Sequence, residues 1–500
     1  MDRHRRRFLR VVAGAGGSAL FAGCTDRLRF DDSPQRPPAQ VSTDPNADAD
    51  ADDAGGVGGS FEQPTIVDFE TAPLTAVVNG SVRTDDGLVA TLDFVEPATS
   101  SSPATLAAVV ENGRSYEQTF EPGRLVVLDD SPASRSSGDA AYLAPAADHP
   151  LAETAPPFSR DDDGRWRLDS VRDEWFPDTL TLEAEEQVEC EYYLLGHYQR
   201  DSQPIQAGRY RFGRREGAFT VTVWPTAEPG PDGDSRFDGT DVPAIPGAEN
   251  GAMRWYHEAT PETPVFLEPS RESVAAPARI EFSLVNHGDE RLSGNPHQWR
   301  LYKLVDGAWH SIAPWAILDP FSWVDPGTTA ASELFLYDGD PIDREDARTI
   351  GHLGGGRYAY TVGYSAGSGT HAALFDLEAP EIRVDPEADA VIDEDGGDTL
   401  VVRLPNYEAA RRPATVTIDR ADSSDDAGAA AERLVPEQLP RRQFRSFRNS
   451  LPLFDDGVDR VLVRTDRSTA LGWFGYDEGV TRTVAYDGEL FEATGSLESE

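Results

Sequence analysis

One serine in this chain stands in a pattern that could support nucleophilic catalysis. Residues 363–367 read Gly-Tyr-Ser-Ala-Gly, and a serine between such glycines can sit on a sharp turn that exposes its hydroxyl for attack on an ester or amide. That geometry needs a helix directly after the serine and a parallel sheet around it. Here Gly369 and an apolar, strand-like stretch at residues 372–377 follow instead. The pattern therefore favours the last hairpin of an antiparallel sheet over a catalytic role for Ser365.

Metal-binding chemistry is not indicated by any spacing in the sequence. The nine histidines show no His-x-His or i, i+4 spacing that would bring two imidazoles to one ion. Residues 44–50 alternate Asp and Asn with other residues, as a calcium loop does, but Ala49 replaces the turn glycine and no glutamate closes the loop. Cys190 lies in an alternating apolar stretch, which is typical of a buried structural thiol. We expect no metal, no cofactor and no catalytic centre.

Aromatic residues offer a different kind of chemistry, because a flat apolar face with a polar edge suits a sugar ring or the surface of a partner protein. The densest aromatic stretch contains Trp299, Tyr302, Trp309, Trp315, Phe321 and Trp323. Trp299 and Trp309 fall on predicted strands, so we expect both in the core. Trp315 and Trp323 fall in a Pro-bounded loop, residues 313–326, and are the predicted exposed contact residues.

The composition indicates folded domains in a salty environment. The formal net charge is −43, yet 39% of the residues are hydrophobic and 9% are aromatic, which is too apolar for a disordered acidic chain. Its 500 residues suffice for about three or four domains. Lys303 is the only lysine among 45 basic residues. This bias resembles the proteins of halophilic archaea, where molar salt, with a Debye length of about 3 Å, screens repulsion between acidic groups.

A nucleic acid partner requires a basic face. The only local basic cluster consists of Arg441, Arg442, Arg445 and Arg448. We therefore expect no nucleic acid partner.

The N-terminus predicts export from the cell. Arg5 and Arg6, followed by Phe8 and Leu9, precede an apolar stretch at residues 11–22, and this order resembles the twin-arginine export signal. The apolar stretch is too short to span a membrane, because a spanning helix takes about 20 residues. The resemblance implies that the chain folds inside the cell and acts outside it.

The end of this segment resembles a lipobox. Phe21 to Cys24 read Phe-Ala-Gly-Cys, with Phe21 where leucine is usual, and the resemblance implies a lipid on Cys24. The alternative is an ordinary signal peptide with an incidental cysteine. The following residues, 26–60, are rich in Asp, Pro, Ala and Gly, a composition typical of a disordered tether. The predicted location is the extracellular face of the cytoplasmic membrane, where the lipid on Cys24 anchors the protein.

An internal repeat defines the body of the chain. An alternating strand ending in Asn, a later Asp-Gly-x-Trp and a Gly-Arg-Tyr occur twice in the same order, at residues 103–112, 163–166 and 208–212 and at residues 277–286, 306–309 and 356–360. Short alternating strands separated by turn residues favour antiparallel sandwiches over βαβ units. The order of motifs resembles bacterial immunoglobulin-like domains, especially the type related to intracellular proteinase inhibitors, over roughly residues 65–225 and 258–384.

These observations predict a mainly β fold of tandem immunoglobulin-like β-sandwiches with a small C-terminal β or α+β domain. The predicted parts are a signal peptide with lipobox at residues 1–24, a disordered acidic tether at 25–60, a sandwich at 61–225 with an insertion at 129–163, a linker at 226–257, a second sandwich at 258–384 and the small domain at 385–500. In that last domain, residues 429–439 read as a short helix broken by Pro436 and 469–476 as a strand.

The predicted function is that of a non-catalytic, lipid-anchored binding or structural module, whose partner is a cell-envelope protein or glycan. Two alternatives stay open at this point. The domain resemblance implies an inhibitor or accessory subunit of an exported protease. An exported hydrolase with its site in the C-terminal domain is the other.

Overall fold

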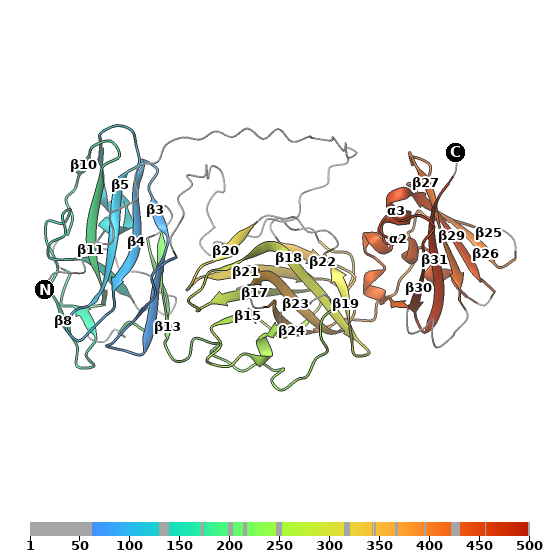
Figure 1. Cartoon of the computed structure of the whole chain (residues 1–500), viewed down its shortest axis with the longest axis horizontal. Coiled ribbons are helices and arrows are strands. Elements are labelled where there is room, and N and C mark those ends of the chain that lie inside the picture. The colour runs from blue at the N-terminus through green and yellow to red at the C-terminus, as the bar shows by residue number, and fades with distance from the viewer. Residues whose placement is uncertain are drawn as a thin grey trace. The chain divides into compact units, whose positions relative to one another are not determined.

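The computed structural model describes residues 63–498 except 130–139, 172–174, 199–203, 214–217, 247–252, 315–320, 343, 345–346, 366–368, 395–396, 422–430 and 456. The export motif, Cys24, the tether and Trp315 therefore lie outside the described residues. Strands far outnumber helices in the part described (Figure 1). The predicted mainly β fold is confirmed.

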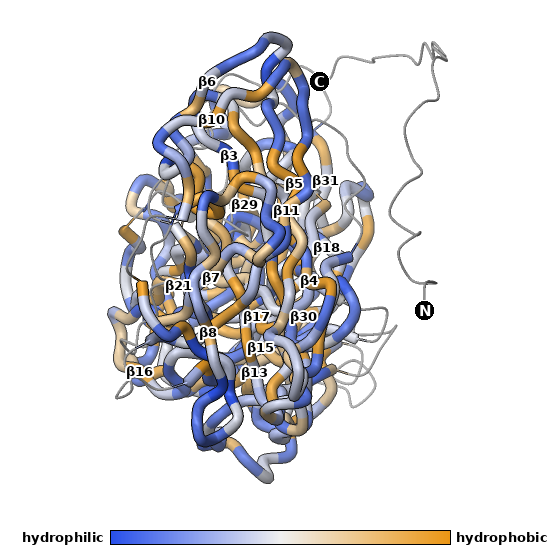
Figure 2. The backbone as a smooth tube through the Cα atoms, turned by 90° about the vertical axis from the view of Figure 1, so that its left-hand side faces the viewer, coloured by the Kyte–Doolittle hydropathy of each residue, from blue (hydrophilic) through white to orange (hydrophobic). Residues whose placement is uncertain are grey.

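The first sandwich has a four-stranded sheet, in the order β1-β2-β13-β12, and a seven-stranded sheet, in which β7 joins the path β3-β4-β5-β11-β9-β8 at β11. Its strands are β1 (Val67–Asp68), β2 (Leu74–Asn79), β3 (Ser81–Arg83), β4 (Leu88–Glu96), β5 (Ala104–Asn112), β6 (Gln118–Phe120), β7 (Ala141–Pro145), β8 (Phe158–Arg160), β9 (Trp166–Leu168), β10 (Leu180–Leu182), β11 (Gln187–Gly196), β12 (Gly208–Phe212) and β13 (Phe219–Pro225). In β11 Cys190 and Tyr192 are buried while Glu189 and Glu191 are exposed, as strand alternation requires. Figure 2 shows apolar and polar residues interleaved along such strands.

The second sandwich pairs the sheet β14-β24-β23-β18-β19, which β16 and β20 join, with the four-stranded sheet β15-β17-β21-β22. Its strands are β14 (Arg254–Trp255), β15 (Val265–Pro269), β16 (Ser273–Ala275), β17 (Ala278–Asn286), β18 (Leu292–Val305), β19 (Ala308–Ala313), β20 (Ser322–Val324), β21 (Thr329–Leu336), β22 (Arg348–Ile350), β23 (Gly356–Ser365) and β24 (His371–Glu378). One apolar core that includes Ile280, Phe282 and Tyr360 fills the space between the two sheets.

The repeated asparagine does the same work in both sandwiches. Asn112 ends β5 with no exposed surface, and its Nδ2 donates to the carbonyl oxygen of Glu183 at 2.8 Å. Asn286 ends β17, is equally buried, and donates to the carbonyl oxygen of Val324 at 3.0 Å. Each side chain therefore fastens the end of its strand to a segment much later in the chain. We call this pair the asparagine clamps.

The repeated tyrosine is also equivalent in the two copies. The hydroxyl of Tyr210 donates to the carbonyl of Gln206 at 3.1 Å, and that of Tyr358 donates to the carbonyl of Gly354 at 2.6 Å. Both tyrosine rings are fully buried. The Gly-Arg-Tyr motif thus places a phenol in the core and ties its hydroxyl to the preceding turn.

The predicted linker at residues 226–257 is not a free connector in its described part. Phe237 and Ile245 are buried and pack with Trp309 and Leu374 in a separate apolar cluster. The indole Nε1 of Trp309 also donates to the carbonyl of Pro243 at 2.8 Å. The Pro- and Gly-rich composition of this segment concealed two apolar residues that anchor it.

The insertion predicted at residues 129–163 is not all surface loop. Within it, β7 pairs antiparallel with β11, and every residue of β7 is buried. Tyr142 and Leu143 supply the apolar surface that draws this segment into the core. The prediction of a surface loop was based on the Ser-, Pro- and Ala-rich residues around them, which hid this short apolar stretch.

The C-terminal domain is a seven-stranded mixed sheet in the order β25-β26-β29-β27-β31-β30-β28. Its elements are β25 (Val391–Glu394), β26 (Thr399–Arg403), β27 (Pro413–Arg420), β28 (Glu432–Arg433), α2 (Arg445–Arg448), β29 (Arg460–Asp466), α3 (Arg467–Leu471), β30 (Thr481–Tyr486) and β31 (Glu489–Leu497). Phe447 of α2 and Leu471 of α3 pack on Val416 and Val463 of the sheet. This small domain therefore combines a sheet with short helices.

Two predictions in this domain were wrong. Residues 432–433 form β28 and residues 436–438 a single 3₁₀ turn, η4 (Pro436–Gln438), instead of the predicted helix, because Pro436 lacks the N–H that a longer helix needs. Residues 467–471 form α3 where a strand was predicted to begin. Asp466 caps this helix by accepting from the backbone N–H of Thr469 at 2.8 Å, a local signal that outweighs the strand propensity of the apolar residues after it.

Candidate functional site

An exposed pair of aromatic rings lies on β20. Residues of this strand alternate, so that Val324 is buried while Trp323 is 45% exposed. Phe321 directly precedes the strand and is 71% exposed, with its ring centroid 6.3 Å from that of Trp323. β20 pairs only with the Leu292–Gly294 part of β18 among the described strands. The rings thus stand on an edge strand of the second sandwich.

A charged pair continues this row. The Arg291 guanidinium lies 5.0 Å above the centre of the Trp323 ring, and its Nε forms an ion pair with Asp325. We call Arg291, Phe321, Trp323 and Asp325 the aromatic edge. It combines apolar faces, a cation held over an aromatic ring and a carboxylate, a set typical of contact surfaces.

The other predicted aromatic residues divide as follows. Trp299 is buried in the core between the two sheets, and Trp309 is buried in the cluster beneath the 226–257 segment. Trp323 lies in the aromatic edge, and Trp315 lies outside the described residues. Arg291 was missed because its position over Trp323 depends on the pairing of β18 with β20. That pairing could not be predicted from the sequence.

A buried cation in the second sandwich was also missed in the sequence analysis. Arg348 of β22 is buried, with its guanidinium 5.0 Å from the Trp299 ring centre and 5.7 Å from that of Tyr360. Its Nη2 donates to the carbonyl of Pro296 at 2.9 Å, whereas Nη1 has no partner in the described structure. Burial lowers the pKa of Arg348 to about 9. The charge of Arg348 lies next to aromatic rings. No carboxylate of the described residues lies within ion-pair distance of it.

The serine of the Gly-x-Ser-x-Gly pattern lies where an antiparallel hairpin was predicted. Ser365 ends β23, and β23 pairs antiparallel with β24, Val362 opposite His371. His371 is buried, and neither ring nitrogen has a hydrogen-bond partner in the described region. Burial lowers its pKa to about 4. The strand–turn–helix setting that a nucleophilic serine needs is not what surrounds Ser365.

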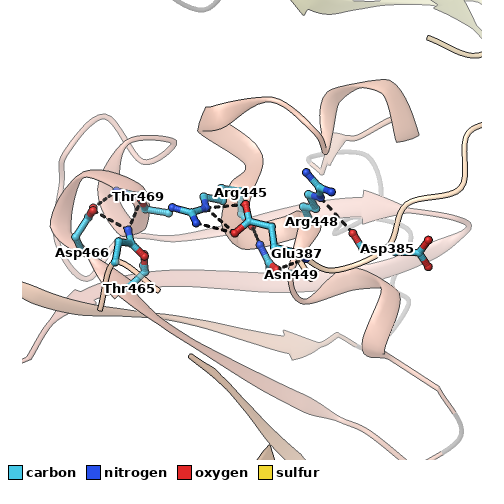
Figure 3. Close-up of polar contacts among 9 residues, drawn as sticks. Asp385, Glu387, Arg445, Arg448, Asn449, Thr465, Asp466 and Thr469 are labelled. Carbon is cyan, nitrogen blue, oxygen red and sulfur yellow. Dashed lines mark hydrogen bonds and ion pairs between the residues drawn. The ribbon is translucent and has the colours of Figure 1, made fainter. Parts of the chain in front are cut away.

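Three of the four arginines at 441–448 are engaged within the fold, and Arg442 is exposed. Arg445 forms a bidentate contact with Glu387, at 2.7 and 2.6 Å from Nε and Nη2, and Arg448 donates to the carbonyl of Asp385 at 3.2 Å (Figure 3). Arg441 donates to the carbonyl of Gly351 at 2.7 Å. This cluster fastens segments together and does not form an open basic face.

A second polar group in Figure 3 has a structural role. Asp466 accepts from Asn406 Nδ2 at 2.7 Å and from Ser468 Oγ at 2.7 Å. It also caps α3 by accepting from the backbone N–H of Thr469 (Figure 3). Thr465 Oγ1 donates to Asn406 Oδ1 at 3.0 Å. Hydrogen bonds lower the pKa of Asp466 despite its partial burial, so its carboxylate is an ionised cap.

The remaining candidates add no further chemistry. Cys190 is a buried free thiol whose pKa burial raises to about 12. No group of three or more potential ligands that could hold a metal ion occurs among the residues described. Within the same residues, no helix has both the length and the apolarity to cross a membrane.

Comparisons with known proteins leave the family open. No protein-family model matches the chain, and no curated protein matches it. Among solved structures, one similar chain is E. coli alpha-2-macroglobulin in its native conformation, with 8% identity over 85% of this chain and 25% of that one. The chain thus spans about a quarter of that protein's length. The TM-score is 0.12, so this likeness carries no argument about fold or function.

Proposed function

We propose that this chain is a lipid-anchored protein on the outer surface of a halophilic archaeal cell, exported by the twin-arginine pathway, with a non-catalytic binding role. Three features of the sequence support this location. The twin arginines support export, the lipobox-like Cys24 supports lipid anchoring, and the acid-rich, lysine-poor composition supports the halophilic setting. The tandem sandwiches support an immunoglobulin-like architecture, in which a rigid scaffold presents a contact surface at its edge.

The observation that carries the binding role is the aromatic edge. Phe321 and Trp323 expose apolar rings on an edge strand, beside the Arg291–Asp325 ion pair. Trp and Arg dominate the energetics of protein contacts, where each anchor is worth about 2 kcal/mol or more. The partner that this set fits best is a protein of the cell envelope.

The test compares a Phe321→Ala/Trp323→Ala variant with Tyr116→Ala, which removes an equally exposed ring from the first sandwich. Immobilised protein is exposed to salt-extracted envelopes, and each captured component is purified and titrated back. We expect one envelope protein to bind the wild type and Tyr116→Ala equally but the double variant at least about tenfold more weakly, since one lost anchor of this kind suffices for that change.

Retention of every component by the double variant would contradict the proposal. Capture that survives digestion of the envelopes with protease would identify a glycan and overturn the assignment to a protein partner.

Export, lipid anchoring and the halophilic setting are tested separately. Replacing Arg5 and Arg6 by lysine should leave precursor in the cytoplasm, and Cys24→Ser should release mature protein into the medium. Secretion that is unchanged by the two lysines would refute the twin-arginine assignment. A melting temperature that does not fall in low salt would count against the halophilic setting, because self-repulsion of the acidic surface is strongest there.

A further inference from the structure

The only lysine of the chain contacts the only buried carboxylate of the described residues. Lys303 lies on β18, Glu437 lies in η4, and the Lys303 ammonium forms an ion pair with Glu437 Oε1. Their side chains are 12% and 3% exposed. Val435, just before η4, belongs to the core of the second sandwich, so this segment is packed as part of that sandwich. The single side-chain amine of this arginine-rich chain therefore lies at this position.

The niche is built from glycines. A Cβ on Gly354 would lie 2.6 Å from Glu437 Oε1 and 3.3 Å from Lys303 Nζ, and a Cβ on Gly356 would lie 3.1 Å from Lys303 Cε. A side chain at either position would push the amine and the carboxyl apart. The glycines at 354 and 356 therefore make the close approach of these two groups possible.

The carboxyl group is held asymmetrically. Glu437 Oε1 accepts from the backbone N–H of Gly354 at 3.2 Å in addition to its contact with Lys303, while Oε2 is buried without a partner in the described structure. A buried ion pair with one oxygen left unsatisfied is costly, because neither charge regains the hydration it lost. A neutral linkage between the two groups would remove that cost.

We propose that Lys303 and Glu437 condense to an amide that cross-links β18 to the η4 segment. The Lys303 ammonium passes one proton to Oε1, the carboxylate oxygen that it contacts, which leaves an amine and a carboxylic acid. Nζ then bonds to Cδ, the bond from Cδ to Oε1 breaks, and Oε1 leaves as water with two of the three ammonium hydrogens. Oε2 stays as the amide carbonyl, and the third hydrogen stays on Nζ. No oxidant or co-reactant takes part.

Two physical effects favour this reaction here. Fixed contact between the reacting groups replaces a bimolecular encounter, and effective molarities of about 10⁵ M or more are reached in well-oriented intramolecular reactions. In water, hydration of the two ions opposes condensation. In this niche that hydration is already lost, so the amide gains relative to the ion pair. The cross-link would close a loop between residues 134 positions apart.

Peptide mass spectrometry of the purified full-length protein tests the proposal directly. Trypsin cuts after arginine and free lysine, so the cross-link predicts one branched species in which residues 301–344 are joined to residues 434–441 with the loss of one water. Cleavage after Lys303, with residues 434–441 recovered as an unmodified peptide and no branched species, would overturn the proposal.

Variants supply the matched controls. Glu437→Leu and Lys303→Met should abolish the branched species. Asp306→Ala, which removes the exposed ion pair with Arg433 beside the same segment, should leave it intact. After denaturation, an amine-specific reagent should label Lys303 in Glu437→Leu but not in the wild type or in Asp306→Ala. Full labelling of denatured wild type would also refute the amide, and the wild-type masses decide the question even if a variant fails to fold.

Discussion

The two sandwiches share their fastenings and differ in what their cores contain. Both have an asparagine clamp and a buried tyrosine tied to a turn. Among the residues described, the first sandwich buries no side chain of Arg, Lys, Asp or Glu, and its buried Thr, Asn and His side chains are neutral. The second sandwich buries the guanidinium of Arg348 and receives the Lys303–Glu437 pair as well.

The difference in buried charges indicates that the second sandwich has a role beyond stability. A fully buried charge is not required for this kind of sandwich, because the first sandwich forms without one among its described residues. Charges buried in an equivalent scaffold do not improve packing and cost desolvation, so they indicate a use beyond stability. The aromatic edge and the lysine niche both belong to the second sandwich, which is the copy that carries the buried charges.

The largest expected effect tests the equivalence of the two copies. Asn112→Ala and Asn286→Ala should each lower the free energy of unfolding by about 3 kcal/mol, because each leaves one buried carbonyl oxygen, that of Leu182 or of Val324, and at least one partly buried carbonyl oxygen without this donor. Urea titration of each variant measures the loss. A large loss in one copy and none in the other would show that the repeat is one of sequence only. Exposed Asp163→Asn is the control and should change little.

The clamps could be anticipated from the sequence, and the aromatic edge only in part. An asparagine at the end of an alternating strand and a tyrosine after Gly-Arg are local signals, so the repeat located both copies. Exposure of Trp323 was predicted from a Pro-bounded loop, but the residue lies on β20, where strand alternation turns it outward. The position of Arg291 over that ring depends on strand register, which local patterns do not determine.

The lysine niche could not be anticipated at all. Lys303 was conspicuous by composition, but Glu437 is one of 88 acidic residues and lies 134 positions away. Only the packing of η4 against the second sandwich distinguishes it. The same holds for the 226–257 segment, where two apolar residues in a Pro- and Gly-rich stretch find a surface that composition does not reveal.

Acid should destabilise both sandwiches in part through buried histidines, and the largest contribution in each comes from His149 or His371. Burial lowers the pKa of His149 and of His371 to about 4, from 6.5. His149 Nδ1 accepts from the backbone N–H of Leu151 at 3.2 Å, so the folded state holds that nitrogen unprotonated. Because the unfolded chain binds the proton first, stability is complete above pH 6.5 and falls as the pH drops toward 4, by about 2 kcal/mol for each histidine.

Unfolding free energies of His149→Phe and His371→Phe, measured between pH 7 and pH 4.5 at constant salt, test this expectation. Each variant should lose part of the pH dependence of the wild type, because other buried histidines, among them His257, His287 and His310, also have lowered pKa values. His352, which is only partly buried, serves as the comparison through His352→Gln, which should change the pH profile less. An unchanged pH profile in either phenylalanine variant would show that the histidine of that sandwich is hydrated in solution.

The smallest effect tests the contrast between the cores. Arg348→Met removes a buried cation but keeps an apolar side chain against Trp299 and Tyr360, so we expect the free energy of unfolding to rise by about 1 kcal/mol. Arg165→Met in the first sandwich, where the arginine is only partly buried and donates to the carbonyl of Ile205 at 3.0 Å, should give no such gain. A loss of about 2 kcal/mol or more in Arg348→Met would mean that the aromatic faces and the Pro296 carbonyl compensate the charge fully. In that case the buried cation would be part of the packing of the second sandwich, and the contrast with the first would reduce to the Lys303–Glu437 pair.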